Sequence, residues 1–122
     1  IYLLNYMEYQ FKNNNDYNKR LAESTNIMQK YKDRIPIIVE KYKQSDLPNI
    51  DKSKYLVPRD MNLGQFIYII RKRIKLESHQ ALFVTINGVL CSSSTIVSEL
   101  YENNKDEDGF LYMIYTSENT FG

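Results

Sequence analysis

Apolar residues recur along this chain at two spacings, and each spacing predicts a kind of element. A mostly apolar stripe at three- and four-residue steps predicts an amphipathic helix after Asp16, a suitable N-cap. A second stripe follows Asn62, and Gln65 stands three residues later, which is the spacing of a capping box. The stripes are Tyr17, Leu21, Ser24, Ile27, Met28 and Tyr31, then Leu63, Phe66, Ile67, Ile70 and Ile74.

Runs of β-branched and aromatic residues predict strands, here at 35–41, 54–58, 83–86, 89–90 and 110–115. Asn87-Gly88 favours a two-residue hairpin turn between the third and fourth runs. Pro36 cannot donate to a β-ladder, so its strand either begins there or has one unpaired side. The Ser-Ser-Ser-Thr segment at 92–95 is a candidate cap for a third helix, which carries Ile96, Val97, Leu100 and Tyr101.

The predicted elements follow one another as two helical segments and then β-β-α-β-β-α-β. That order predicts an α+β fold of the β-grasp, or ubiquitin-like, class with two additional N-terminal helices. No repeat or linker divides the chain, and 122 residues suit one domain. We assign residues 7–122 to that domain and residues 1–6 to an N-terminal extension of uncertain origin.

Composition and charge exclude several functional classes. With 43% hydrophobic and 25% charged residues, the chain is typical of soluble globular proteins. Its net charge of +1 provides no global field that favours nucleic acid. A single cysteine, Cys91, leaves no intramolecular disulfide, and the apolar residues 1–4 are too few to span a bilayer. We therefore expect a cytosolic protein that is monomeric in its free form.

The sequence offers no catalytic or metal-binding constellation. His79 lacks a partner at ligand spacing, and no base is indicated that would activate Cys91. The acidic residues 106–108 lack the spacing of a calcium loop and are interpreted as a solvated turn. The basic residues 71–75 are interpreted as the polar side of a helix. We expect no enzyme activity, no metal and no cofactor.

Four ordered blocks of sequence resemble one known family. They are residues 31–41, 54–58, 64–73 and 105–112, and a Glu-Asn-Thr-Phe-Gly tail follows at 118–122. Together they resemble the autophagy ubiquitin-like modifiers, the family that includes GABARAP, from Met7 to Gly122. The two helical segments before the first strand also agree with this resemblance.

The resemblance implies a function that depends on Gly122. In this family a cysteine protease trims the chain to its glycine, and E1-like and E2-like enzymes join that glycine to phosphatidylethanolamine. The lipid is a covalent modification rather than a cofactor, and its two acyl chains would anchor the protein to a membrane. The expected protein is cytoplasmic when free. Once lipidated, it supports autophagosome formation on autophagosomal or other vesicle membranes and recruits cargo receptors and adaptors. The alternative is a non-conjugated ubiquitin-fold adaptor that binds peptides or cytoskeletal partners in vesicle trafficking.

Residues 54–57 have the features of a strand at a sheet edge, since they are few, include a lysine and precede a proline. An edge strand can accept an extended peptide, and the resemblance implies an aromatic-x-x-aliphatic motif, usually preceded by acidic residues. Alternation places Tyr55 and Val57 opposite Lys54 and Leu56. The resemblance implies an aromatic pocket of Glu23, Ile27, Pro36, Ile38, Lys54, Leu56 and Phe110. It implies an aliphatic pocket of Tyr55, Val57, Pro58, Met61, Phe66 and Ile69.

Arg34, Lys52 and Arg73 are candidate contacts for the acidic flank of such a peptide. The alternative for each is an ordinary solvated charge. Ser53 stands where the family commonly has a lysine, which removes one charge beside the expected groove. We expect Tyr55→Ala combined with Leu56→Ala to abolish peptide binding and to leave the fold intact.

Overall fold

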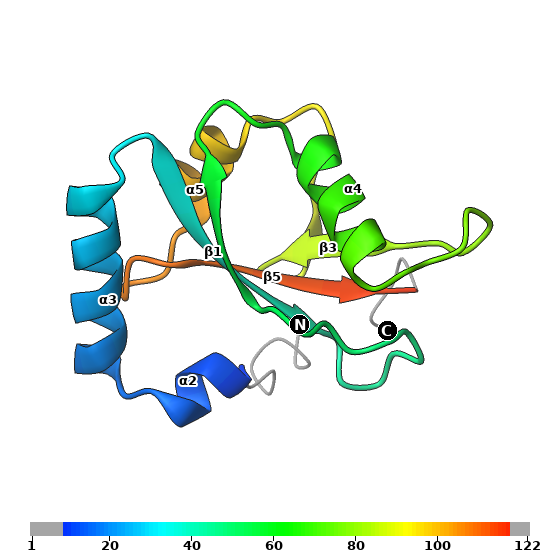
Figure 1. Cartoon of the computed structure of the whole chain (residues 1–122), viewed down its shortest axis with the longest axis horizontal. Helices are drawn as coiled ribbons and strands as arrows, with labels where there is room; N and C mark the ends of the chain where they lie inside the picture. The colour runs from blue at the N-terminus through cyan, green and yellow to red at the C-terminus, as the bar shows by residue number, and fades with distance from the viewer. Residues whose placement is uncertain (1–8, 118–122) are drawn as a thin grey trace.

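The computed structural model describes residues 9–117, which form a mixed five-stranded sheet with helices against both faces (Figure 1). The strand order is β2-β1-β5-β3-β4. The β1–β5 pair is parallel, and the β1–β2, β3–β5 and β3–β4 pairs are antiparallel. The strands are β1 (Arg34–Lys41), β2 (Lys54–Pro58), β3 (Phe83–Ile86), β4 (Val89–Leu90) and β5 (Leu111–Thr116). This topology confirms the predicted β-grasp fold.

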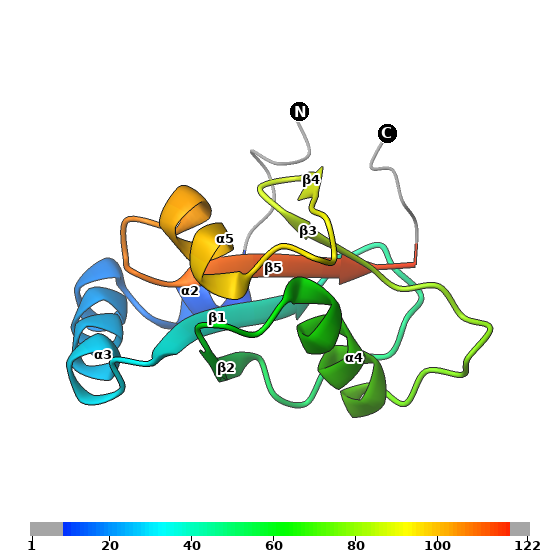
Figure 2. The same ribbon diagram turned by 90° about the horizontal axis from the view of Figure 1, so that it is seen from above.

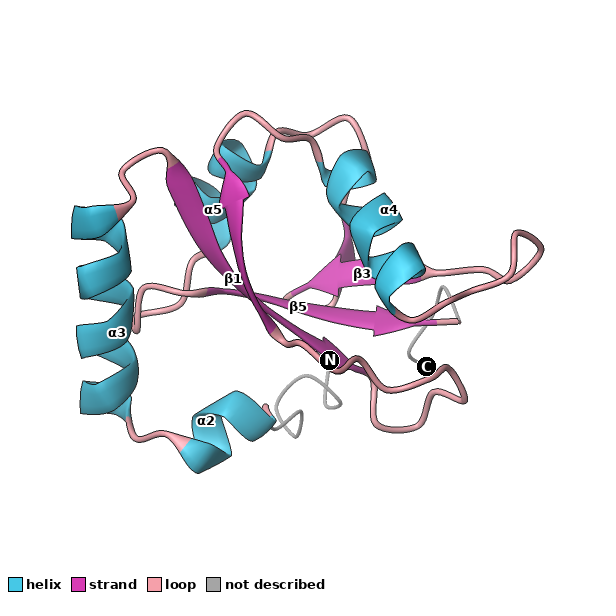
Figure 3. Cartoon of the chain, viewed as in Figure 1, coloured by secondary structure: helices cyan, strands magenta, loops and turns pink. Residues whose placement is uncertain are grey.

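Two helices precede the first strand in the described residues, as Figure 3 shows, and two more lie between strands. The helices are α2 (Gln10–Asn14), α3 (Tyr17–Lys30), α4 (Leu63–Arg73) and α5 (Val97–Asn104). Asp16 caps α3, because its side chain accepts a hydrogen bond from the Lys19 N–H at 2.8 Å. Asn62 and Gln65 form the predicted capping box of α4, with reciprocal bonds of 2.8 and 2.9 Å.

The sheet separates two hydrophobic cores. On one face, residues of β1, β2 and β5 pack with the buried sides of α4 and α5 in the main core. On the other face, Ile38, Phe110 and Tyr112 form a second core against which α2 and α3 pack. Figure 2 shows α4 and α3 well separated, next to different parts of the sheet. β1 and β5 are therefore buried on both faces, which explains their continuous apolar runs.

Two local backbone predictions are confirmed. Asn87 and Gly88 have φ of 52° and 78°, and the ladder pairs Ile86 with Val89 on either side of them. Pro36 pairs with Leu56 of β2, whereas the ladder to β5 begins one residue later. The strand thus begins before Pro36 and leaves that residue one unpaired side.

The predicted apolar stripe of α3 is only partly correct. Ser24 is buried, and Ile27 is half-buried against the second core. Tyr17, Leu21 and Tyr31 are 43%, 37% and 39% exposed. The helix lies at one end of the sheet (Figure 1), where Met28 is half-buried against the main core, so part of the stripe is covered and part is exposed.

The predicted cap of α5 is wrong. Ile96 occupies the N-cap position, and no side chain makes a capping bond there. The hydroxyls of Ser92 and Ser94 bond to each other at 2.9 Å, and the Thr95 N–H donates to the Ser92 carbonyl at 3.1 Å. These residues form a turn of their own before the helix, so their hydroxyls do not reach its first N–H groups.

Candidate functional site

β2 lies at one edge of the sheet, as predicted, so one side of its backbone has no strand partner among residues 9–117. The Val39 N–H donates to the Ser53 carbonyl at 2.7 Å, and bonded pairs recur at every second residue of an antiparallel ladder. The backbone groups of Tyr55 therefore face β1, whereas those of Lys54 and Leu56 face outward. An added strand could pair with these two outward-facing residues.

The inner residues predicted for the aromatic pocket belong to the second core. Ile38 and Phe110 have no exposed surface, and Ile27 of α3 packs against their cluster. Phe11 of α2 packs there too, with its ring centroid 5.1 Å from that of Phe110. Phe11 is absent from the predicted set, and its only signal in the sequence is its place in an aromatic-rich opening segment.

The outer residues of the same predicted pocket join α3 to the edge strand. Glu23 of α3 forms an ion pair with Lys54 of β2, and the Lys54 ammonium lies 5.4 Å from the Phe11 ring centroid. Pro36 and Leu56 are partners in the β1–β2 ladder, where Pro36 is buried and Leu56 keeps part of its surface. The structure therefore brings the predicted aromatic set together on the α3 side of the sheet.

The residues predicted for the aliphatic pocket meet on the α4 side. Tyr55, Val57 and Phe66 are in the main core, where the rings of Tyr55 and Phe66 meet edge to face at 5.4 Å. Met61 is half-buried against this core, and Ile69 is 37% exposed on α4. Pro58 is the last residue of β2 and is half-buried, and it is not among the residues that pack against this core.

The expectation that Tyr55→Ala with Leu56→Ala leaves the fold intact conflicts with this packing. Tyr55 is only 6% exposed and contacts Phe66 inside the main core. Truncation of a buried aromatic ring costs about 3–5 kcal/mol of stability. A binding test therefore requires substitutions at the exposed or half-buried residues of the site.

The three cations predicted for an acidic flank differ in their surroundings. Arg73 forms an exposed ion pair with Asp51 at 2.9 Å, and its hydrogen bond lowers the pKa of the Asp51 carboxyl. Arg34 donates to the Leu56 carbonyl at 3.3 Å, which is an acceptor on the outer edge of β2. Lys52 is exposed, with its ammonium 5.1 Å from the Tyr55 ring centroid. Arg73 is thus already paired with Asp51, and Lys52 is the cation of the three that is most available to an acidic peptide.

The turn before β5 is not solvated throughout, which corrects the interpretation of residues 106–108. Asp108 has no exposed surface, and its carboxylate accepts a hydrogen bond from Arg20 at 2.7 Å. It also accepts the Phe110 N–H at 2.9 Å and the Tyr112 hydroxyl. The sequence gives no sign of this burial, because the compensating arginine stands 88 residues earlier.

Burial raises the pKa of two phenol groups near this turn and the end of the sheet. Burial and the adjacent Asp108 raise the pKa of Tyr112 well above its ordinary value. Burial likewise raises the pKa of Tyr115 to about 12, and its hydroxyl donates to the Pro48 carbonyl at 2.6 Å. Each hydroxyl thus donates a hydrogen bond, Tyr112 to the Asp108 carboxylate and Tyr115 to the Pro48 carbonyl.

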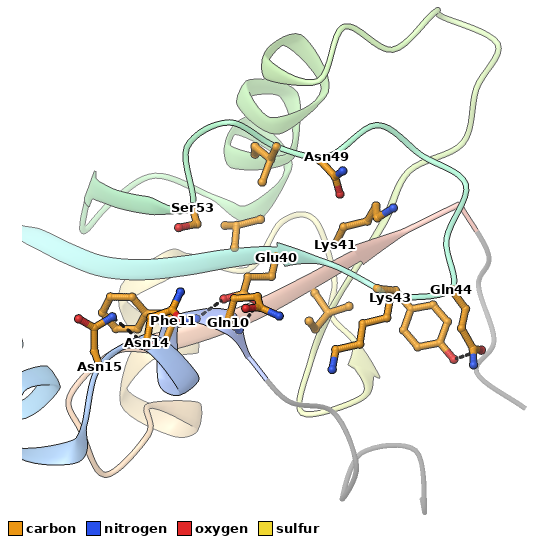
Figure 4. Close-up of a pocket in the computed structure, with 14 residues that line it drawn as sticks. Gln10, Phe11, Asn14, Asn15, Glu40, Lys41, Lys43, Gln44, Asn49 and Ser53 are labelled. Carbon is orange, nitrogen blue, oxygen red and sulfur yellow. Dashed lines mark hydrogen bonds between the residues drawn. The ribbon is translucent and has the colours of Figure 1, made fainter.

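An open pocket of about 700 Å³ lies between α2, the end of β1 and the loop that leads to β2 (Figure 4). Glu40 points toward α2, where its carboxylate accepts the N–H groups of Gln10 and Phe11 at 2.8 and 3.0 Å. Ser53 lines the pocket from the loop side. None of the side chains predicted for the two peptide pockets lines this one, so it is a separate feature beside the start of β2.

The predicted conjugation residue, Gly122, lies outside the described residues. Within residues 9–117, no three His, Cys, Asp or Glu side chains gather as they would around a metal ion. The same residues include no helix with the length and apolar character needed to cross a membrane.

Comparison with known proteins gives a consistent match. A family model described as "Autophagy protein Atg8 ubiquitin like" matches residues 19–122. Autophagy-related protein 8 of Scheffersomyces stipitis is 54% identical over 116 residues, which cover 95% of this chain and 84% of that protein. Autophagy-related protein 8e of Arabidopsis thaliana is 56% identical over 112 residues, which cover 92% of each.

Solved structures match the fold as well. The crystal structure of Trypanosoma brucei ATG8 has a TM-score of 0.88 at 40% identity, covering 95% of this chain and 100% of that chain. Plasmodium falciparum Atg8, solved in complex with a Plasmodium falciparum Atg3 peptide, has a TM-score of 0.86 at 33% identity. That match covers 93% of this chain and 100% of the Plasmodium chain.

Proposed function

The chain belongs to the Atg8 family of ubiquitin-like autophagy proteins, and we propose that it is a modifier joined through Gly122 to phosphatidylethanolamine. On autophagosomal membranes it supports autophagosome formation and recruits receptors and adaptors that carry aromatic-x-x-aliphatic motifs. Before lipidation it is cytoplasmic. The match to the family model runs to residue 122, which supports the assignment of that glycine.

The position of β2 between two cores is the observation that carries the peptide-binding part of the proposal. Side chains alternate along an extended peptide, so residues i and i+3 point to opposite faces. A peptide strand added to β2 directs one anchor toward Ile27 and Phe110 and the other toward Met61 and Ile69. A separation of two residues between the anchors therefore suits this edge.

A micromolar affinity is expected for such a peptide. Each buried anchor contributes about 1.5–3 kcal/mol. Backbone pairing adds to this, and ordering of the peptide offsets part of the gain. The net value is about −8 kcal/mol, which corresponds to a micromolar dissociation constant.

The experiment that tests two-face docking varies the anchor spacing. Three peptides of equal composition carry one, two or three residues between an aromatic and an aliphatic anchor, and calorimetry measures their affinities. The two-residue spacing should bind at least about tenfold more tightly than the one-residue spacing, which places both anchors on one face. Equal affinities for these two peptides would show that the anchors do not enter pockets on opposite faces.

A pair of exposed apolar residues provides the matched substitution. Ile69→Ala changes a 37% exposed side chain of the proposed aliphatic pocket, and Val89→Ala changes a 62% exposed side chain at the opposite sheet edge. We expect Ile69→Ala to weaken the peptide about threefold to tenfold and Val89→Ala to leave its affinity unchanged. A similar loss in both variants would place the peptide elsewhere.

Conjugation is tested at Gly122. Glycine lacks a Cβ, so its backbone can pass through a narrow enzyme channel, and Gly122→Ala should prevent transfer to the lipid. The measurement is the intact mass of the protein after incubation with E1-like and E2-like enzymes and phosphatidylethanolamine vesicles. Membrane recruitment that persists unchanged in Gly122→Ala would instead favour a non-conjugated adaptor.

The proposed enzyme partners are supported by two different comparisons, one with a solved structure and one with the family model. The Plasmodium neighbour was solved with an Atg3 peptide, and this supports an E2-like conjugating enzyme as a partner of the present chain. We propose the E1-like enzyme and the processing and delipidating cysteine protease as partners as well, and membership of the family supports this.

A further inference from the structure

A buried polar cluster fixes α3 to the turn before β5. We call it the α3 hub and define it as Arg20, Ser24, Asp108, Gly109 and Tyr112. We propose that Asp108 of this hub is a positioning residue for peptide binding, because it sets where α3 stands relative to β2. This proposal rests on the peptide-binding role proposed above and deepens it.

The carboxylate of Asp108 is fully engaged. Arg20 Nη1 lies 2.7 Å from Asp108 Oδ2, with side-chain exposures of 11% and 0%. The Tyr112 hydroxyl donates to the same oxygen, and the Phe110 N–H donates to Oδ1 at 2.9 Å. The Nε of Arg20 also donates to the Asn15 carbonyl at 3.0 Å. One buried ion pair thus joins α3, the segment before it and β5.

Ser24 brings α3 into direct contact with the backbone of the same turn. Its hydroxyl donates to the Asp108 carbonyl. Gly109 has φ of +89°, and a Cβ built there would lie 2.3 Å from the Ser24 hydroxyl oxygen. The Tyr101 hydroxyl of α5 holds the Gly109 carbonyl at 2.7 Å. Figure 1 shows this turn, in orange, running beside α3.

The hub matters for binding because α3 supplies one wall of the proposed aromatic pocket. Glu23 precedes Ser24, and Ile27 follows it by three residues, so both move with the helix segment that the hub holds. Elsewhere the helix contacts the two cores through the half-buried Ile27 and Met28, whereas Tyr17 and Leu21 are 43% and 37% exposed. A change at Asp108 should therefore shift this wall without altering the outward-facing backbone of β2.

The test measures what each peptide anchor contributes in each protein variant. An aromatic-x-x-aliphatic peptide is titrated by NMR alongside two versions in which either the aromatic or the aliphatic anchor is alanine. Asp108→Asn keeps the shape of the side chain and removes its charge. Glu107→Gln is the matched control, because it neutralises an exposed carboxylate in the same turn.

In Asp108→Asn, the affinity ratio between the full peptide and its aromatic-to-alanine version should fall about tenfold. The ratio for the aliphatic anchor should stay within about twofold of its wild-type value. Glu107→Gln should retain both wild-type ratios. An equal loss at both anchors would show a general structural defect and would overturn the positioning role.

A second pair of variants keeps the test decisive if Asp108→Asn does not fold. Ser24→Ala removes one hub contact from α3, and Thr25→Ala changes its exposed neighbour on the same helix. Ser24→Ala should lower the affinity ratio between the full peptide and its aromatic-to-alanine version about threefold, and Thr25→Ala should not change this ratio. If this affinity ratio is unchanged in Ser24→Ala, the proposal is overturned. If the wild type fails to bind the full peptide, the proposed peptide-binding function falls, and this proposal falls with it.

Discussion

Two buried tyrosines of the main core should respond in opposite directions when each is replaced by phenylalanine. Tyr55 is 6% exposed, and its hydroxyl has no hydrogen-bond partner among residues 9–117. Tyr115 is fully buried, and its hydroxyl donates to the Pro48 carbonyl at 2.6 Å. The two substitutions delete the same atom from the same core, so the hydrogen bond is the main difference between them.

The change in the free energy of unfolding depends on whether the deleted hydroxyl was hydrogen-bonded. An unsatisfied buried polar group costs about 1–3 kcal/mol, so Tyr55→Phe should raise the free energy of unfolding by at least about 1 kcal/mol. Tyr115→Phe loses one hydrogen bond, but Pro48 is exposed and its carbonyl can be rehydrated. That loss should therefore be about 1 kcal/mol, and the two variants should differ by about 2 kcal/mol.

Urea unfolding followed by circular dichroism measures this difference. The m-values should be equal, because both variants expose the same surface on unfolding. The melting temperatures should separate by about 6–8 °C for a chain of this size. A loss in Tyr55→Phe as large as that in Tyr115→Phe would refute the reasoning, because it would mean that the Tyr55 hydroxyl is satisfied in solution.

Three further predictions follow from local contacts. Asn62→Ala should cost about 1 kcal/mol of unfolding free energy through loss of the capping box, whereas Thr95→Ala should cost little because α5 has no side-chain cap; urea titration separates them. Gly109→Ala should lower the melting temperature strongly, since φ is +89° and the new Cβ would lie 2.3 Å from a buried serine hydroxyl; an unchanged temperature would argue against this turn geometry. Burial alone would raise the pKa of Asp106, but the hydrogen bond from a lysine of α2 gives a net lowering. The stability advantage over Asp106→Asn should therefore be complete above the unfolded pKa of about 4 and be lost as pH falls through the lower pKa of the folded state; unfolding measured at pH 7 and at a series of pH values below 4 checks this.

Features set by neighbouring residues could be predicted from the sequence. The capping box of α4 needs only Asn62 and Gln65, and the hairpin needs only the positive φ that Asn87-Gly88 tolerates. The edge position of β2 also followed from its own short, proline-ended sequence. In each case the physical cause lies within a few residues of its effect.

Features set by distant partners could not be predicted in this way. Asp108 stands in an acidic segment that has the composition of a solvated turn. Its charge can be buried because Arg20 of α3 forms an ion pair with it. Phe11 has no local sign of its contact with Phe110 and Lys54, which depends on how α2 docks. The Ser92–Thr95 segment has good capping residues, yet its hydroxyls are used within their own turn.

The second core explains why the N-terminal helices and the proposed peptide site belong together. Without α2 and α3, the sheet would expose Ile38, Phe110 and Tyr112, each of which gains about 1.5–3 kcal/mol from burial. The helices that cover this face do not close it at the edge, because Leu56 of the edge strand retains exposed surface. A β-grasp sheet without them could still pair a peptide strand with β2, but only the α4 side would offer a pocket for an anchor. The same residues that bury the second face of the sheet therefore provide the second pocket of the proposed site.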